Sequence, residues 1–148
     1  MKRFLTLALV VLAALSMSAQ WSSPKNIPAY NAEAPKKGTK MKPILPLLMR
    51  AGPNFQHAFQ KKAYEAAEKN ADVFHQQPCY CFCDRGFGHN SLRSCFETEH
   101  GAHCAACMKE AFYTAKMTKQ KKTAAQIREG IIRGEWQAID LEKPAFEN

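Results

Sequence analysis

The sequence predicts a mainly α protein: a small three-helix domain around a Cys/His-rich loop region, preceded by an extended Pro/Lys-rich tether. Three observations lead to this prediction. Apolar residues recur at helical spacing in three segments, prolines crowd the stretch before them, and all six cysteines lie between residues 79 and 107. At 148 residues the chain has room for one domain with tails. We expect the Cys/His-rich helical domain over 54–140, followed by a flexible tail at 141–148.

Residues 1–19 have the features of a secretory signal peptide. Lys2 and Arg3 precede an uncharged, largely apolar run that ends at Leu15, and small residues around Ala19 supply a site for signal peptidase. The run is shorter than the roughly 20 apolar residues that a membrane-spanning helix needs. We therefore predict a mature protein that is periplasmic or secreted and has no stable insertion in the membrane.

Residues 20–53 are predicted to form an extended linker. Proline interrupts both helix and sheet because it removes a backbone donor and fixes φ. The prolines of this stretch are Pro24, Pro28, Pro35, Pro43, Pro46 and Pro53. An apolar patch over 43–49 is the part of the linker that we expect to dock on the domain.

Three helices are expected in the domain. The first covers about 54–70, and Asn54 is a suitable N-cap for it. The second covers about 105–119. The third follows Thr123, whose spacing from Gln126 is that of a capping box.

The segment from residue 75 to 107 carries all six cysteines and four of the five histidines. Cys79, Cys81 and Cys83 alternate with aromatic residues, so an extended backbone would place three sulfurs on one face, where they can converge on a soft metal. Two further cysteines stand at the predicted start of the second helix, where the helix dipole favours a thiolate. The candidate metal ligands are Cys79, Cys81, Cys83, Cys95, Cys104, Cys107, His89, His100 and His103.

Two functions of different classes fit this concentration of cysteine and histidine. Thiolate with imidazole selects Cu(I) or Zn(II) over hard cations, so the first hypothesis is an exported protein that holds copper or zinc for sequestration or delivery. The alternative is a structural or interaction domain stapled by up to three disulfides, because an even number of cysteines in an oxidising compartment favours bridges. The histidines favour the metal, since a staple does not need them.

Other functions find no support in the sequence. The net charge of +8 comes from basic residues in the linker and at a helix end, without the interleaved aromatics of a nucleic-acid face, so nucleic acid is not expected as a partner. Met108 follows the Cys104–Cys107 pair where covalent haem attachment requires histidine. No Gly-rich phosphate loop, Ser-His-Asp order or carboxylate pair stands out, and we predict no catalytic residues.

Two strings of the cysteine-rich segment are distinctive, Pro78-Cys79-Tyr80-Cys81-Phe82-Cys83 and the downstream Cys104-Ala105-Ala106-Cys107. With them the chain resembles the bacterial family named for its PCYCGC motif. The resemblance implies an exported protein, often a lipoprotein in that family, for which no biochemical function is established. This chain departs from the pattern in two ways: no cysteine follows the apolar run to accept a lipid, and Phe82 replaces the motif's glycine. If that glycine has a positive φ angle in relatives, Phe82 must adopt the same strained conformation or rearrange the turn.

Overall fold

The computed structural model describes residues 22–143 of the chain. The predicted signal peptide, 1–19, and the end of the predicted tail, 144–148, lie outside the described residues. Over 22–143 the secondary structure is helical and no strand forms, which confirms the mainly α fold class. Among these residues, no helix has both the length and the apolar composition needed to cross a membrane.

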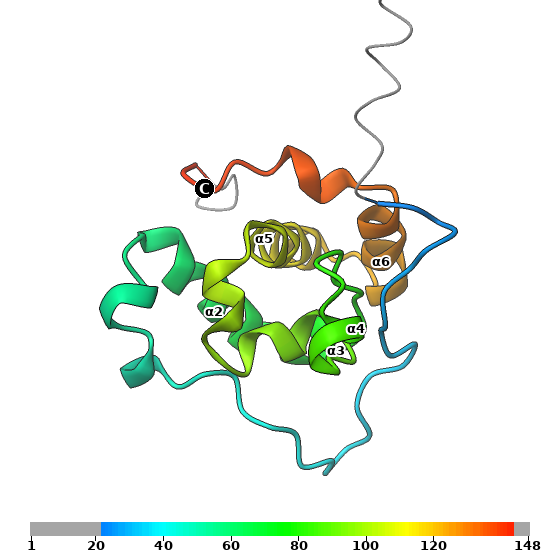
Figure 1. Ribbon diagram of the computed structural model, residues 1–148. Helices are drawn as coiled ribbons and strands as arrows, with labels where there is room; N and C mark the ends of the chain where they lie inside the picture. Colours follow the sequence, from blue (N-terminus) through cyan, green and yellow to red (C-terminus); the bar gives the residue numbers. More distant parts are fainter. Residues whose placement is uncertain (1–21, 144–148) are drawn as a thin grey trace, which may run out of the picture.

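The helix α5 occupies the centre of the molecule, with α2 and α6 on either side of it (Figure 1). The α-helices are α2 (Ala58–Lys69), α3 (Ala71–His75), α4 (Cys83–Phe87), α5 (Ala105–Lys119) and α6 (Ala124–Ile132). Short 3-10 helices connect or flank them: η2 (Leu47–Met49), η3 (Gly52–Asn54), η4 (Leu92–Phe96), η5 (Glu99–His103) and η6 (Glu135–Ala138).

Helix α5 is central because its inward residues join the cores of its neighbours. Met108, Ala111 and Phe112 are buried and belong to one hydrophobic cluster with residues of α2 and α6. Helix α6 approaches α5 closely because Gly130 has no side chain. A Cβ atom at this position would lie 1.9 Å from Tyr113 Oη. The three helices expected from the sequence therefore share a single core.

The start of α2 differs from the expected one. We predicted a helix from residue 54 with Asn54 as its N-cap, but α2 begins at Ala58, after His57. Pro53 lies in the separate turn η3, and the Asn54 side chain donates to Glu99 instead of capping a helix. His57, expected to be an ordinary surface residue of the helix, is its exposed N-cap, and its N–H donates to Gln60 Oε1 at 2.8 Å.

The capping box predicted for α6 is present. Gln126 N–H donates to Thr123 Oγ1 at 3.2 Å, and Thr123 N–H donates to Gln126 Oε1 at 3.0 Å. This reciprocal pair gives acceptors to two backbone N–H groups at the helix start and fixes where α6 begins.

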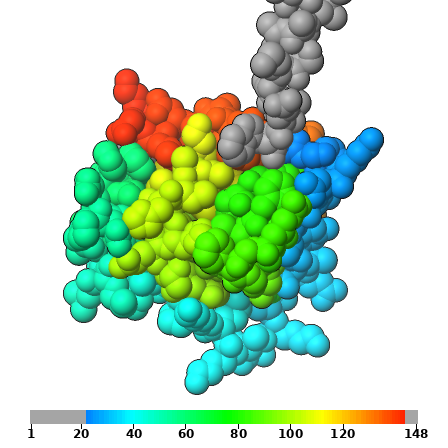
Figure 2. Space-filling model, viewed as in Figure 1, coloured from blue at the N-terminus to red at the C-terminus, as the bar shows by residue number. Residues whose placement is uncertain are grey.

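The segment 22–53 contains no α-helix and runs around the edge of the helical unit (Figure 1). Ile44 and Leu45 of the predicted docking patch are buried, and Leu45 N–H donates to Phe96 O at 2.9 Å. Nearer the N-terminus, Ala29 N–H donates to Asp84 Oδ2 at 3.0 Å. Figure 2 shows this part of the segment against the region that carries the cysteine motif. Apart from turns and the short 3-10 helices η2 and η3, the segment has no helix or strand, and it covers part of the Cys/His-rich region.

Candidate metal centre

Cys79, Cys81 and Cys83 come together through a turn. Phe82 N–H donates to Cys79 O at 3.1 Å, and Phe82 has φ 55° and ψ 30°, in the left-handed region. Helix α4 then begins at Cys83. The extended backbone for which we considered the alternation of cysteines does not form: no neighbouring strand pairs with this part of the described chain, and the backbone closes a local hydrogen bond instead. The sulfurs nevertheless converge, with Sγ–Sγ distances of 3.2 Å for Cys79–Cys81 and 2.9 Å for Cys81–Cys83.

Long-range hydrogen bonds fix this turn against the rest of the site. Tyr80 N–H donates to Glu110 Oε1 on α5 at 2.8 Å. The carbonyl of Gln77, just before the motif, accepts from Leu92 N–H at 2.8 Å, which places η4 and its Cys95 beside the turn. These bonds bring together sulfurs that lie far apart in the sequence.

The candidate ligands form three overlapping groups. In each group the ligand atoms, one sulfur or ring nitrogen per residue, lie within 4.8 Å of one another. The groups are Cys79, Cys81, Cys95 and Cys107; Cys81, Cys83 and His100; and Cys83, His89 and Cys95. The contacts between elements are short: 3.3 Å for Cys79 Sγ–Cys107 Sγ, 2.9 Å for Cys83 Sγ–His100 Nε2 and 3.3 Å for His89 Nδ1–Cys95 Sγ.

Two of the nine predicted ligands lie outside these groups. Cys104 is the N-cap of α5, and its sulfur accepts the Cys107 N–H at 3.5 Å. His103 is exposed at the end of η5. His75, a weaker candidate from the sequence, ends α3, where its backbone carbonyl accepts from the Asn31 side chain at 3.0 Å. The structure thus brings together five cysteines and two histidines of the predicted set.

A comparison with models of protein families identifies the family that carries the cysteine motif. The family model for proteins of unknown function with a PCYCGC motif matches residues 31–137. The chain belongs to this family. No curated protein and no solved structure gives a significant match. In this PCYCGC protein Phe82 stands at the glycine of the motif, and its positive φ angle is the conformation that glycine adopts without strain.

All six cysteines of this PCYCGC protein are free thiols. The closest sulfur pair, Cys81–Cys83, is 2.9 Å apart, whereas a disulfide has an S–S distance of about 2.05 Å. The described structure therefore does not show the disulfides of the alternative hypothesis, and its free sulfurs are in a form that can ligate metal.

Burial and mutual contact raise the pKa of most of these thiols. Burial raises the pKa of Cys79 well above its ordinary value and is the main cause of the raised pKa of Cys83. Hydrogen bonds with neighbouring thiols raise the pKa of Cys107, and the bond with Cys104 has the largest effect. The pKa of Cys104 is lowered, by its hydrogen bonds with Cys107 and Cys81 and by backbone N–H groups at the start of α5. Metal binding must therefore displace protons from the thiols whose pKa is raised.

The two histidines of the groups lie at the outer side of the site. Both are half-buried, and their ring centroids are 5.1 Å apart. Burial, and then repulsion from His100, lowers the pKa of His89. A lowered pKa favours neutral imidazole, which is the form that binds metals.

A small void lies beside the sulfurs. It has a volume of about 10 Å³, and its lining includes Cys79, Cys83 and His89 from the site and Pro28 and Ala29 from the N-terminal segment. This is roughly the space of one water molecule. The N-terminal segment therefore closes one side of the sulfur cluster.

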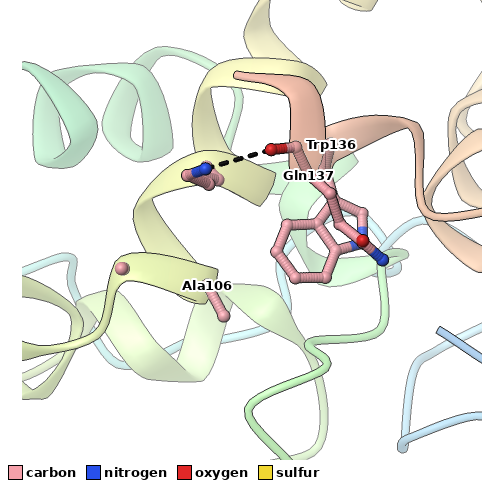
Figure 3. A pocket seen from close by; sticks show the side chains of 5 residues that line it. Ala106, Trp136 and Gln137 are labelled. Atoms are coloured by element: carbon pink, nitrogen blue, oxygen red, sulfur yellow. Dashed lines mark hydrogen bonds between the residues drawn. The ribbon is translucent and has the colours of Figure 1, made fainter. Parts of the chain in front are cut away.

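A larger pocket, of about 250 Å³, lies beside the first turn of α5 (Figure 3). Trp136 and Gln137 form one side of it and Ala106 lies opposite, while Lys109 Nζ donates to Gln137 O at 3.0 Å. No cysteine or histidine lines this pocket. It is therefore separate from the candidate metal centre.

Sequence reasoning missed Glu110, which is fully buried beside the motif turn. Its Oε1 accepts from Tyr80 N–H, while its Oε2 has no hydrogen-bond partner. Burial is the main cause that raises the pKa of Glu110 to about 8. A signal was available, because Glu110 follows Cys107 by three residues and so shares its face of α5.

We expect Glu110→Gln to flatten the pH dependence of stability in the reduced, metal-free protein. The pKa of Glu110 is about 8 in the folded protein against an ordinary value of 4.5, so between these values the folded state binds more protons than the unfolded state. Its contribution to stability is therefore full below pH 4.5 and falls as pH rises through about 8. The amide keeps the acceptor for Tyr80 and does not titrate.

Urea unfolding at about pH 5 and about pH 8 measures this dependence. Glu65→Gln, which removes an exposed carboxylate on α2, is the matched control and should behave as the wild type does. A Glu110→Gln protein that loses as much stability as the wild type over this window would refute the assignment.

Proposed function

We propose that this chain is an exported protein that binds a soft metal ion, Cu(I) or Zn(II), through its Cys/His cluster and thereby sequesters or delivers that metal. The observation that carries the proposal is the meeting of five cysteine sulfurs and two imidazoles in three overlapping groups. Thiolate and imidazole are the donors that select these two ions over hard cations.

The crowding of the sulfurs supports a ligand role. Thiols are weak hydrogen-bond donors and acceptors, so contacts such as Cys79–Cys81 at 3.2 Å and Cys79–Cys107 at 3.3 Å contribute little stability by themselves. Holding several thiols at these distances inside the protein becomes favourable when an ion replaces their protons and joins them.

The test is to purify the exported chain without added reductant and to measure both bound metal and free thiols. We expect at least one copper or zinc ion per chain, and six thiols that react after denaturation and metal removal. The double substitution Cys104→Ser/Cys107→Ser should lower the metal content. His57→Ala, which changes an exposed histidine at the start of α2, should leave it unchanged.

The same measurement decides between metal and staple. A metal-free protein with no reactive thiol would refute the metal function and favour a disulfide-stapled domain. Metal content that stays at the wild-type value in the double cysteine variant would refute the assignment of the ligands.

Export is tested by expressing the full chain in a bacterium, separating the compartments and sequencing the N-terminus of the protein in the periplasm or medium. The proposal predicts a chain that starts near Gln20, after the small residues that follow the apolar run. A protein that keeps Met1 and stays in the cytoplasm would contradict export and leave the metal proposal standing.

A further inference from the structure

We infer that the centre is a trinuclear Cu(I) site in which three thiolates bridge three ions. This inference rests on the proposed function and specifies the number, kind and arrangement of the ions. It starts from the overlap of the three ligand groups, because each pair of groups shares one cysteine and no cysteine belongs to all three.

The shared cysteines link the groups in a ring. Cys81 belongs to the four-cysteine group and to the group of His100, and Cys83 belongs to both histidine groups. Cys95 belongs to the four-cysteine group and to the group of His89. One ion in each group therefore gives a closed six-membered ring in which metal and sulfur alternate.

The remaining ligands are terminal. Cys79 and Cys107 complete a first ion with four sulfurs, while His100 and His89 each complete an ion that has two bridging sulfurs. Two of the three positions thus offer three donors. Zinc in structural sites is almost always four-coordinate, whereas Cu(I) is stable with three soft ligands, so the donor count favours Cu(I).

The distances suit shared ions. At a metal–sulfur bond of about 2.3 Å, two sulfurs on one ion lie about 4 Å apart. The bridging sulfurs of Cys81 and Cys95 are 3.9 Å apart, and that of Cys83 is 2.9 Å from Cys81. Loading therefore requires sulfur movements of about 1 Å, which side-chain rotation can supply without refolding of the turn.

The charge balance is also favourable. Three Cu(I) ions displace the protons of five thiols, so five protons leave and the ring with its terminal ligands carries a charge of about −2 by simple addition. Cys107 lies in the first turn of α5, where the positive end of the helix dipole favours negative charge. No electron transfer is involved, because copper is supplied and bound as Cu(I).

Native mass spectrometry of the reduced chain tests this arrangement, with Cu(I) supplied under anaerobic conditions from a copper-chelating buffer. We expect three ions in the wild type, two in His89→Ala, two in His100→Ala and one in the double variant. His103→Ala is the matched control, because His103 is exposed and lies outside the groups, and it should bind three ions.

Copper K-edge X-ray absorption of the wild type gives a second test that needs no variant. Three bridged ions should produce copper–copper scattering. A single bound ion without such scattering would overturn the trinuclear arrangement and leave the proposed metal binding intact, whereas a reduced chain that binds neither copper nor zinc would overturn both. Three ions retained in the His89→Ala and His100→Ala variants would refute the terminal imidazole ligands.

Discussion

Replacing Cys81 with serine should abolish most of the metal affinity of this chain. Cys81 is the best-connected sulfur of the site, with Sγ–Sγ distances of 2.9 Å to Cys83, 3.2 Å to Cys79 and 3.9 Å to Cys95. A serine oxygen is a hard donor that binds soft ions poorly. Removing a residue that only hydrogen-bonds to a metal ligand typically lowers metal affinity by about 10–100-fold. We therefore expect the loss of Cys81, itself a ligand, to lower metal affinity by more than about 100-fold.

The effect can be measured as metal-dependent stability. At a free metal concentration about 100 times the wild-type Kd, one bound ion should stabilise the wild type by about 2.7 kcal/mol and a 100-fold weaker variant by about 0.4 kcal/mol. Unfolding by urea with and without metal, under reducing conditions, gives both values. Met49→Ser removes an exposed sulfur outside the cluster and should keep the full gain. An equal gain in Cys81→Ser would contradict the role of Cys81.

Replacing Phe96 with alanine should cost about 3–5 kcal/mol of stability. Phe96 has no exposed surface, and its ring packs edge-on against Tyr64 at 4.9 Å and against Phe74 at 5.8 Å between centroids. The ring thus joins α2, α3 and η4 at the centre of the core, directly after Cys95. Its removal leaves a cavity, because aromatic neighbours held by α2 and α3 can relax only in part.

Urea unfolding of the metal-free protein measures this cost. Phe87→Ala is the matched control: Phe87 is 69 % exposed, and its replacement should change the free energy of unfolding by no more than about 0.5 kcal/mol. A loss below about 1 kcal/mol in Phe96→Ala would show that the core does not depend on this ring.

The helices with local signals were the ones that the sequence predicted well. The second predicted helix, 105–119, coincides with α5, and the Thr123–Gln126 pair marks the start of α6. Capping and apolar spacing are properties of a few neighbouring residues, so they can be recognised without a structure. The start of α2 was misplaced because Gly52 and Pro53 form a 3-10 turn of their own, after which a different residue caps the helix.

The composition of the site could be predicted, but its conformation could not. Alternation of cysteine with aromatic residues is typical of a strand, yet here it folds as a turn with Phe82 in the left-handed region. The choice depends on distant partners, such as Glu110 for Tyr80 N–H, which the local pattern does not contain. Phe82 itself did carry a signal, because it occupies a position where the motif has glycine.

The contacts of the N-terminal segment also lay beyond local reasoning. Its prolines predicted a segment without α-helix, and residues 22–53 contain none, but they did not predict that Pro28 and Ala29 would lie beside the sulfurs. Such contacts depend on single hydrogen bonds over long sequence distances, such as Ala29 N–H to Asp84. Composition gives no information on them.

A crystal structure of the chain loaded with Cu(I), with anomalous scattering recorded at the copper edge, tests the central claim most directly. We expect anomalous density between the sulfurs of Cys79, Cys81, Cys95 and Cys107, with further density beside His89 and His100. Copper bound only at exposed side chains such as His57 or His103, with the cluster sulfurs unligated or joined as disulfides, would contradict the account.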